Sequence, residues 1–152
     1  RVLFRSVGCV VLDKQGNLTA GTSTGGMFKK RWGRIGDSPV IGAGTYADNN
    51  SCAVSCTGHG EYFIRHAVAF DVCARYKYLK ESVEKAADYI IHTELNTNAG
   101  NGGLIAVDKL GNIAMPYNSG GMFRGFLYKE KGRPEIKKGC GIGKKIVVVG
   151  EK

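Results

Sequence analysis

The chain has 152 residues; 43% of them are hydrophobic, 23% are charged, and the formal net charge is +9. This hydrophobic content supports a packed core and excludes an intrinsically disordered chain, and no apolar run is long enough to span a bilayer. The basic residues gather toward the ends, since residues 128–152 hold seven lysines and one arginine against three glutamates. A body with little net charge and no stacking-aromatic motif disfavours a nucleic-acid-binding module, so we expect neither a nucleic-acid nor a membrane partner.

The first part of the chain predicts a β-hairpin followed by a long loop. Residues 7–12 and 18–24 are β-rich runs on either side of a polar turn at 13–17. Residues 25–44 are rich in glycine and predict a loop, and residues 52–56 predict a short strand of small side chains. These elements place strands before any helix.

Two helices and a second hairpin are predicted to follow. Apolar residues recur at helical spacing over 61–79 and again over 81–94. A loop rich in glycine and asparagine spans 96–103, and residues 104–107 and 112–115 predict the second hairpin. Strands cluster with strands and helices with helices, which indicates an α+β fold, with a layered sheet covered by helices on one face.

The two predicted hairpins resemble each other in sequence. Asp13, Gly16 and Asn17 recur as Asp108, Gly111 and Asn112, and a Gly-Gly-Met-Phe run follows each hairpin. Convergent turn chemistry explains the match, because Asp, Gly and Asn all suit tight turns. An internal duplication is the alternative, although two copies are too few to define a repeat fold.

The cysteines indicate free thiols. There are five, at irregular spacing: Cys9, Cys52, Cys56, Cys73 and Cys140. An odd count of this kind is not typical of a disulfide framework, and free thiols fit a reducing compartment, so we expect a cytoplasmic protein. Cys52 and Cys56 with His59 fit no zinc motif well, and we expect small buried thiols and no metal site.

Four segments dense in glycine and hydroxyl side chains carry the strongest functional signal. They are Ser6-Val7-Gly8, Gly21-Thr22-Ser23-Thr24-Gly25-Gly26, Gly33-Arg34-Ile35-Gly36-Asp37-Ser38-Pro39 and Cys56-Thr57-Gly58-His59-Gly60-Glu61. In order and spacing they resemble the plant-type L-asparaginase and isoaspartyl peptidase family, the N-terminal-nucleophile (Ntn) hydrolases whose catalytic β subunit opens with Thr-Val-Gly. The resemblance covers residues 7–125 and implies an αββα sandwich of which this chain holds only the β-subunit half.

The resemblance implies a nucleophile and its helpers. Ser6 stands where the family has its N-terminal Thr, the nucleophile, whose free α-amine is exposed by self-cleavage and acts as the base. Thr24 matches the residue that orients the nucleophile. Thr57 and Gly58 match the oxyanion hole, through a hydroxyl and a backbone N–H. Taken alone, Thr24 and Thr57 are more typical of turn or cap residues.

The resemblance also implies a site for the substrate's amino-acid end. Arg34 matches the guanidinium that pairs with the α-carboxylate. Asp37 and the Gly60 carbonyl match the groups that face the α-ammonium. Without the family, an Arg and an Asp three residues apart on a glycine-rich loop are suited to grip a zwitterionic amino acid, or form a surface ion pair.

The sequence departs from the family in three ways. The nucleophile position holds Ser6 in place of Thr, residues 1–5 precede it, and the N-terminal half of the family's fold is absent. We interpret residues 1–6 as a non-native leader resembling a translated sequencing-adapter end, 7–127 as the Ntn-hydrolase β-subunit domain, and 128–152 as a basic divergent tail with an extra strand at 146–149. The rival interpretation is a genuine degenerate paralogue.

The resemblance implies a hydrolase of L-asparagine and β-aspartyl (isoaspartyl) dipeptides, and the departures from the family predict that this chain is an incomplete and inactive fragment. No organic cofactor is expected, and the family's cation-binding loop would lie in the missing half. The expected partners are the missing N-terminal α subunit and a second copy, in a homodimer of αβ units. The alternative is a non-catalytic paralogue that keeps the fold as an interaction module.

Overall fold

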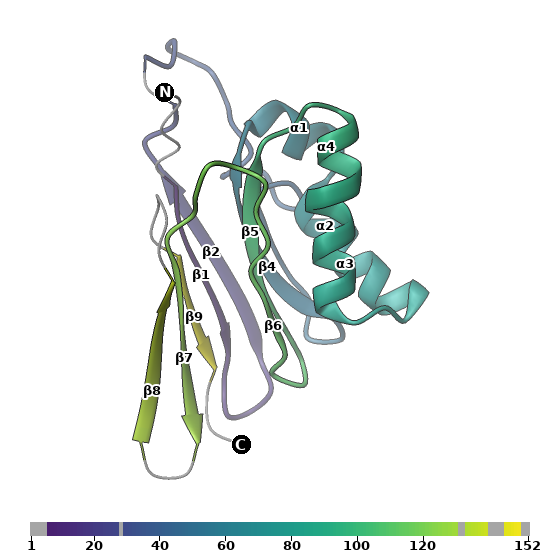
Figure 1. Ribbon diagram of the computed structural model, residues 1–152, viewed down its shortest axis with the longest axis vertical. Coiled ribbons are helices and arrows are strands. Elements are labelled where there is room, and N and C mark those ends of the chain that lie inside the picture. The colour runs from purple at the N-terminus through teal and green to yellow at the C-terminus, as the bar shows by residue number, and fades with distance from the viewer. Residues whose placement is uncertain (1–5, 28, 131–132, 140–144, 150–152) are drawn as a thin grey trace.

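The computed structural model describes residues 6–27, 29–130, 133–139 and 145–149. These residues form two β-sheets that pack face to face and a layer of helices on the outside of one sheet (Figure 1). The mixture of helices and sheets agrees with the predicted α+β class, and the helices lie on one face as expected. None of the helices in this described part of the chain is long and apolar enough to cross a bilayer.

The first sheet contains both ends of the described chain. Its order is β2-β1-β9-β7-β8. The strands are β1 (Ser6–Leu12), β2 (Leu18–Thr24), β7 (Arg124–Glu130), β8 (Arg133–Gly139) and β9 (Lys145–Val149). The predicted first hairpin is confirmed, since β1 and β2 pair antiparallel from Ser6↔Thr24 to Leu12↔Leu18.

Two strands of the first sheet, β7 and β9, contain residues of the predicted C-terminal tail. The extra strand expected at 146–149 is confirmed as β9, which pairs in parallel with both β1 and β7. β7 runs through residue 127, so the predicted division between 7–127 and 128–152 falls inside a strand. Residues 1–5, the body of the predicted leader, lie outside the described residues.

The second sheet forms the centre of the molecule. Its order is β3-β4-β5-β6, and every neighbouring pair is antiparallel. The strands are β3 (Thr45–Ala47), β4 (Cys52–Gly58), β5 (Gly102–Asp108) and β6 (Ile113–Ala114). The predicted strand at 52–56 and the second hairpin are confirmed. β3 was not predicted, because three residues are too few to show an alternating pattern.

The continuous helix predicted over 61–79 is wrong. The segment divides into α1 (Gly60–Arg65), α2 (Val68–Ala74) and a π-helical turn, η1 (Arg75–Leu79). Ala67 interrupts it with a left-handed φ of 45°. The backbone N–H groups of Ala69 and Phe70 donate to the carbonyl oxygens of Ala43 and Gly42, at 3.1 and 2.8 Å. These bonds to the preceding loop cap α2 and redirect the chain, so tertiary contacts override helical periodicity here.

The second helical segment follows the sequence more closely. It comprises α3 (Val83–Tyr89), η2 (Ile90–Glu94) and α4 (Leu95–Thr97), three residues beyond the predicted end. Ser82 caps its start, because the Ser82 hydroxyl accepts the backbone N–H of Lys85 at 3.2 Å. The predicted apolar face is confirmed, with Val83, Ala86 and Ile90 fully buried.

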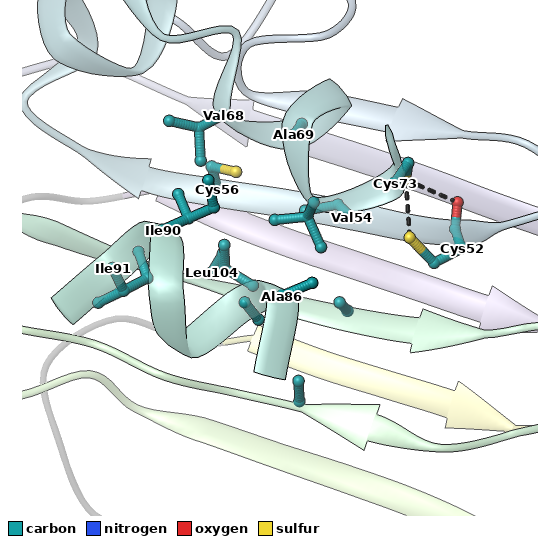
Figure 2. Packing of buried hydrophobic residues seen from close by; sticks show 14 of the residues in the cluster. Cys52, Val54, Cys56, Val68, Ala69, Cys73, Ala86, Ile90, Ile91 and Leu104 are labelled. Atoms are coloured by element: carbon teal, nitrogen blue, oxygen red, sulfur yellow. Dashed lines mark hydrogen bonds between the residues drawn. The ribbon is translucent and has the colours of Figure 1, made fainter. Parts of the chain in front are cut away.

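The core has two layers because β4 and β5 are buried on both faces. Alternation along β4 turns Cys52, Val54 and Cys56 toward the helices, where they pack with residues such as Ile90 and Leu104 (Figure 2). Ala53, Ile105 and Val107 face the first sheet instead and pack with Val10, Leu12, Leu18 and Met122. The second sheet therefore links the helices to the strand that carries Ser6.

Candidate active site

A cleft of about 390 Å³ lies where the starts of β1 and α1 meet the ends of β2 and β4. The long loop at 25–44 supplies much of its wall. The cleft brings together six of the seven residues singled out in the sequence: Ser6, Thr24, Arg34, Asp37, Gly58 and Gly60. The seventh, Thr57, precedes Gly58 on β4 and is not among the lining residues.

Ser6 and Thr24 form the end of the first hairpin. They lie directly opposite each other in the antiparallel register, which places their Cβ atoms roughly 5 Å apart on one face of the sheet. Ser6 is only 9% exposed. The Thr24 hydroxyl oxygen accepts the backbone N–H of Gly26 at 2.8 Å, which leaves its own proton for another acceptor. The pairing therefore supplies a hydroxyl beside Ser6.

Gly58 occupies a position that only glycine fits. A Cβ at this residue would overlap the carbonyl oxygen of Asn101, and its φ is 157°. The hydroxyl oxygen of the adjacent Thr57 is buried and makes no hydrogen bond within the described part of the chain. A buried polar group normally has a partner, so this hydroxyl has unused hydrogen-bonding capacity beside the cleft-lining Gly58.

Asp37 lies deep in the cleft wall because two glycines make room for it. The residue is only 6% exposed. A Cβ on Gly60 would lie 2.9 Å from Asp37 Oδ1, and one on Gly44 would overlap the Asp37 carbonyl oxygen. The Asp37 carbonyl also accepts the backbone N–H of Val40 at 2.9 Å, which closes a turn. Asp37 and Gly60 are thus immediate neighbours, although they are distant in sequence.

Arg34 forms an ion pair that the sequence did not indicate. Its guanidinium Nη2 lies 2.9 Å from Oε2 of Glu61, in the first turn of α1, and both side chains are partly exposed. An exposed pair of this kind contributes little to stability. It holds the guanidinium at the rim of the cleft, where an incoming carboxylate can compete with Glu61.

Two further residues on the cleft were missed. The Thr22 hydroxyl donates to the Gly44 carbonyl at 3.1 Å and lies 2.6 Å from the Ser55 hydroxyl, which joins the two sheets beneath the cleft. Thr22 lies two residues before Thr24, so strand alternation could have placed it on the same face. Lys30 folds over Gly26, with its Nζ 2.8 Å from where a Cβ would stand, and no local pattern signals that contact.

Exposed apolar side chains stand on the loop that walls the cleft and on the outer face of β1. Trp32 is fully exposed, and Ile35 is 70% exposed. Val7, which follows Ser6 on β1, is 51% exposed. Ile35 lines the cleft and Trp32 lies three residues before it on the same loop, and exposed apolar side chains so placed are typical of a region that another segment or chain covers.

Cys52, Cys56 and His59 are the residues that the sequence analysis considered for a metal site. Cys52 and Cys56 point into the core beneath the helices, where Cys52 contacts Cys73. His59 precedes α1, and its ring centroid lies 6.2 Å from that of Tyr62. Across the described ranges, no group of three or more His, Cys, Asp or Glu side chains is placed to hold a metal ion.

A family profile and several known proteins each match most of this chain. The family profile described as "Asparaginase" matches residues 3–135. The isoaspartyl peptidase of Salmonella typhimurium is 53% identical over 123 residues, covering 81% of this chain and 39% of that protein. The Escherichia coli isoaspartyl peptidase is 48% identical over 137 residues, covering 84% and 43%. The Mus musculus isoaspartyl peptidase/L-asparaginase is 46% identical over 121 residues, covering 77% and 36%. The chain therefore spans less than half the length of these relatives.

Proposed function

Because this chain belongs to the asparaginase family, we propose that it is the catalytic half of a hydrolase acting on L-asparagine and β-aspartyl dipeptides. The observation that carries the proposal is the convergence of Ser6, Thr24, Asp37 and Gly58 on one cleft. These residues come from a hairpin, a loop and a strand of the other sheet. The names of the relatives, isoaspartyl peptidase and L-asparaginase, support the choice of substrates.

In the proposed reaction the Ser6 hydroxyl attacks the side-chain carbonyl carbon of the substrate. Its proton passes to the α-amine of Ser6, which needs a free N-terminus because a peptide nitrogen cannot accept a proton. Thr24, opposite Ser6, holds the hydroxyl and amine in position. Ammonia or the leaving peptide amine departs with that proton, and water then hydrolyses the β-aspartyl ester on Ser6.

The proposed oxyanion hole lies at the end of β4. As the carbonyl oxygen becomes negative, the Thr57 hydroxyl and the Gly58 N–H donate to it. The Thr57 hydroxyl has no described partner that would compete for this bond. Loss of one such donor in other enzymes costs roughly 100- to 1,000-fold in rate.

The proposed substrate grip uses opposite charges on one loop. The Arg34 guanidinium takes the α-carboxylate in a planar fork, displacing Glu61. Asp37 and the neighbouring Gly60 carbonyl take the α-ammonium. Since asparagine and β-aspartyl peptides share this end, the same grip serves both substrates.

The proposed activity requires cleavage of the peptide bond before Ser6 and a second polypeptide segment that completes the fold. In this chain Arg5 precedes Ser6, so cleavage between them must release the amine. The relatives are more than twice as long, and we propose that the additional segment supplies the α subunit, with a further layer of helices that completes an αββα sandwich. Exposed Val7, Trp32 and Ile35 are the surfaces we expect it to cover. The αβ unit is proposed to form a homodimer.

A second candidate function depends on whether the peptide bond between Arg5 and Ser6 is cleaved. If the Arg5–Ser6 peptide bond stays intact, the base is lost, and the chain is a fold-retaining, non-catalytic paralogue or interaction module. Mass spectrometry of the protein carrying its preceding segment decides between the two. A fragment that begins at Ser6 supports the hydrolase, and an uncut chain supports the paralogue.

The activity test follows release of ammonia from L-asparagine and of aspartate from a β-aspartyl dipeptide by the cleaved, two-part protein. Replacing Arg34 with Ala should lower kcat/KM roughly 100-fold or more, mainly through KM, because the α-carboxylate loses its partner. Arg31→Ala, an exposed arginine on the same loop, is the matched control. Near-normal kinetics for Arg34→Ala would exclude the carboxylate assignment, and activity in Ser6→Ala would exclude the nucleophile.

A further inference from the structure

Two cysteines lie side by side in the core, away from the cleft. Cys52 begins β4 and Cys73 lies near the end of α2, and their sulfur atoms are 2.7 Å apart (Figure 2). The Cys73 thiol also lies 3.3 Å from the Cys52 carbonyl oxygen. Cys52 is fully buried and Cys73 is 2% exposed. Gly58, on the candidate site, stands at the opposite end of β4, so the proposed hydrolase chemistry does not use this pair.

The backbone around the pair is already held at short range. The Ser51 hydroxyl donates to the Cys73 carbonyl oxygen at 2.8 Å, which ties α2 to the residue preceding β4. A disulfide needs sulfur atoms about 2.05 Å apart, so a small side-chain adjustment closes the remaining gap. We propose that Cys52 and Cys73 are a cross-linking site, at which a peroxide joins α2 to β4 through a disulfide.

The chemistry consumes one peroxide for each cross-link. The Cys73 thiolate, the more accessible of the two, attacks one peroxide oxygen, the O–O bond breaks, and hydroxide leaves and takes up the Cys73 proton as water. Cys52 then attacks the sulfur of the resulting sulfenic acid. The S–S bond forms, the S–O bond breaks, and the hydroxyl leaves as a second water with the Cys52 proton. Two thiols are oxidised and one peroxide is reduced.

The same geometry limits the rate at which peroxide oxidises this cysteine pair. The adjacent Cys52 thiol and burial in the core both raise the pKa of Cys73, so the reactive thiolate is scarce in the closed structure. Oxidation therefore follows local opening of α2, a segment of seven residues that starts after the left-handed Ala67. In a reducing compartment both cysteines stay as free thiols, and the disulfide forms when peroxide is present.

The test treats the unmodified chain with hydrogen peroxide, alkylates the remaining thiols and maps the peptides by mass spectrometry without reductant. We expect one disulfide-linked peptide pair containing Cys52 and Cys73, and its loss after treatment with dithiothreitol. The cross-linked chain should melt on the order of 5 °C higher than the reduced chain, because the disulfide restricts the unfolded ensemble.

Single substitutions provide the matched comparison. Cys52→Ala and Cys73→Ala should each abolish the linked peptide, and Cys56→Ala, also buried on the same face of β4, should leave it intact. The peptide map of the unmodified chain is informative even where a variant fails to fold. Alkylated Cys52 and Cys73 after peroxide has oxidised Cys9, sulfinic acid at Cys73 without a cross-link, or equal linkage to Cys56 or Cys140 would each overturn the proposal.

Discussion

The two hairpins of this chain share a turn but differ at their open ends. In the first, the Asp13 carboxylate accepts the backbone N–H groups of Gln15 and Asn17 and the Asn17 side-chain amide. In the second, Asp108 does the same with Leu110 and Asn112. Gly16 and Gly111 follow with φ values of 86° and 90°.

The shared turn gives the two hairpins the same register. Gly8 lies opposite Thr22 in the first, and Gly103 lies opposite Tyr117 in the second. The turn alone accounts for this match, because its length fixes which residues face each other. Beyond the turn, the first hairpin ends in the Ser6 and Thr24 hydroxyls. At the second, the Asn118 side chain accepts the backbone N–H of Gly102 and donates to the carbonyl oxygens of Ile91 and Gly100. The comparison teaches that the turn chemistry sets the pairing of the two strands, whereas the residues at the open ends can differ without changing it.

The largest expected difference between the hairpins comes from removing the turn carboxylates. Asp108 is 1% exposed, so Asp108→Ala leaves three partly buried N–H donors without their acceptor and should lower the free energy of unfolding by about 3 kcal/mol. Asp13→Ala should cost clearly less, since water replaces the exposed carboxylate. Urea unfolding of both variants measures the two losses of free energy. Equal losses would show that the burial of the carboxylate does not set its contribution.

The bridge from Thr22 to Ser55 and Gly44 distinguishes the first hairpin next. At the matching place in the second hairpin, Tyr117 lies under the Arg124 guanidinium, 4.5 Å from the ring centroid. Thr22→Val keeps the side-chain shape, loses both hydrogen bonds, and should lower the free energy of unfolding by about 1–2 kcal/mol. Thr19→Val, an exposed position on the same strand, is the control. Identical losses at both positions would show that the bridge contributes nothing.

The turn glycines should behave alike in the two hairpins. A left-handed φ costs an alanine about 1 kcal/mol, and nothing else lies within 4 Å of a Cβ at Gly16. Gly16→Ala and Gly111→Ala should therefore lower the unfolding free energy by similar amounts in a thermal or urea titration. A much larger loss at Gly111 would mean that packing, and not the turn, sets its cost.

The smallest expected effect is a dependence of stability on acid at the first turn. The Asn17 side chain and backbone N–H lower the pKa of Asp13 below its ordinary value of 3.8. Its contribution to stability is complete above that value and disappears as the pH falls through the lower, folded-state pKa. Asp13→Asn should therefore flatten the difference in unfolding free energy between neutral pH and pH values below 3.8. An unchanged acid profile would remove this role for Asp13.

Sequence predicted well where the cause is local. The Asp-x-x-Gly-Asn turns and the alternation around them place β1, β2 and β5, and the apolar spacing from Val83 to Ile91 places the second helical segment. The long helix at 61–79 failed because the carbonyls of Gly42 and Ala43, distant in sequence, accept the first N–H groups of α2. The roles assigned to the cleft residues came from motif order, and they stay predictions for the kinetic tests.

By itself, the sequence determined the turns, the strand registers that depend on them, and the family of the chain, because each is written in residues close together. Only the tertiary structure decided that Asp37 reaches Gly60, that Arg34 pairs with Glu61 and that Cys52 meets Cys73. The physical reason is that these contacts arise when two sheets and a helical layer pack to bury apolar surface. That packing brings together side chains whose distance along the chain gives no sign of their proximity.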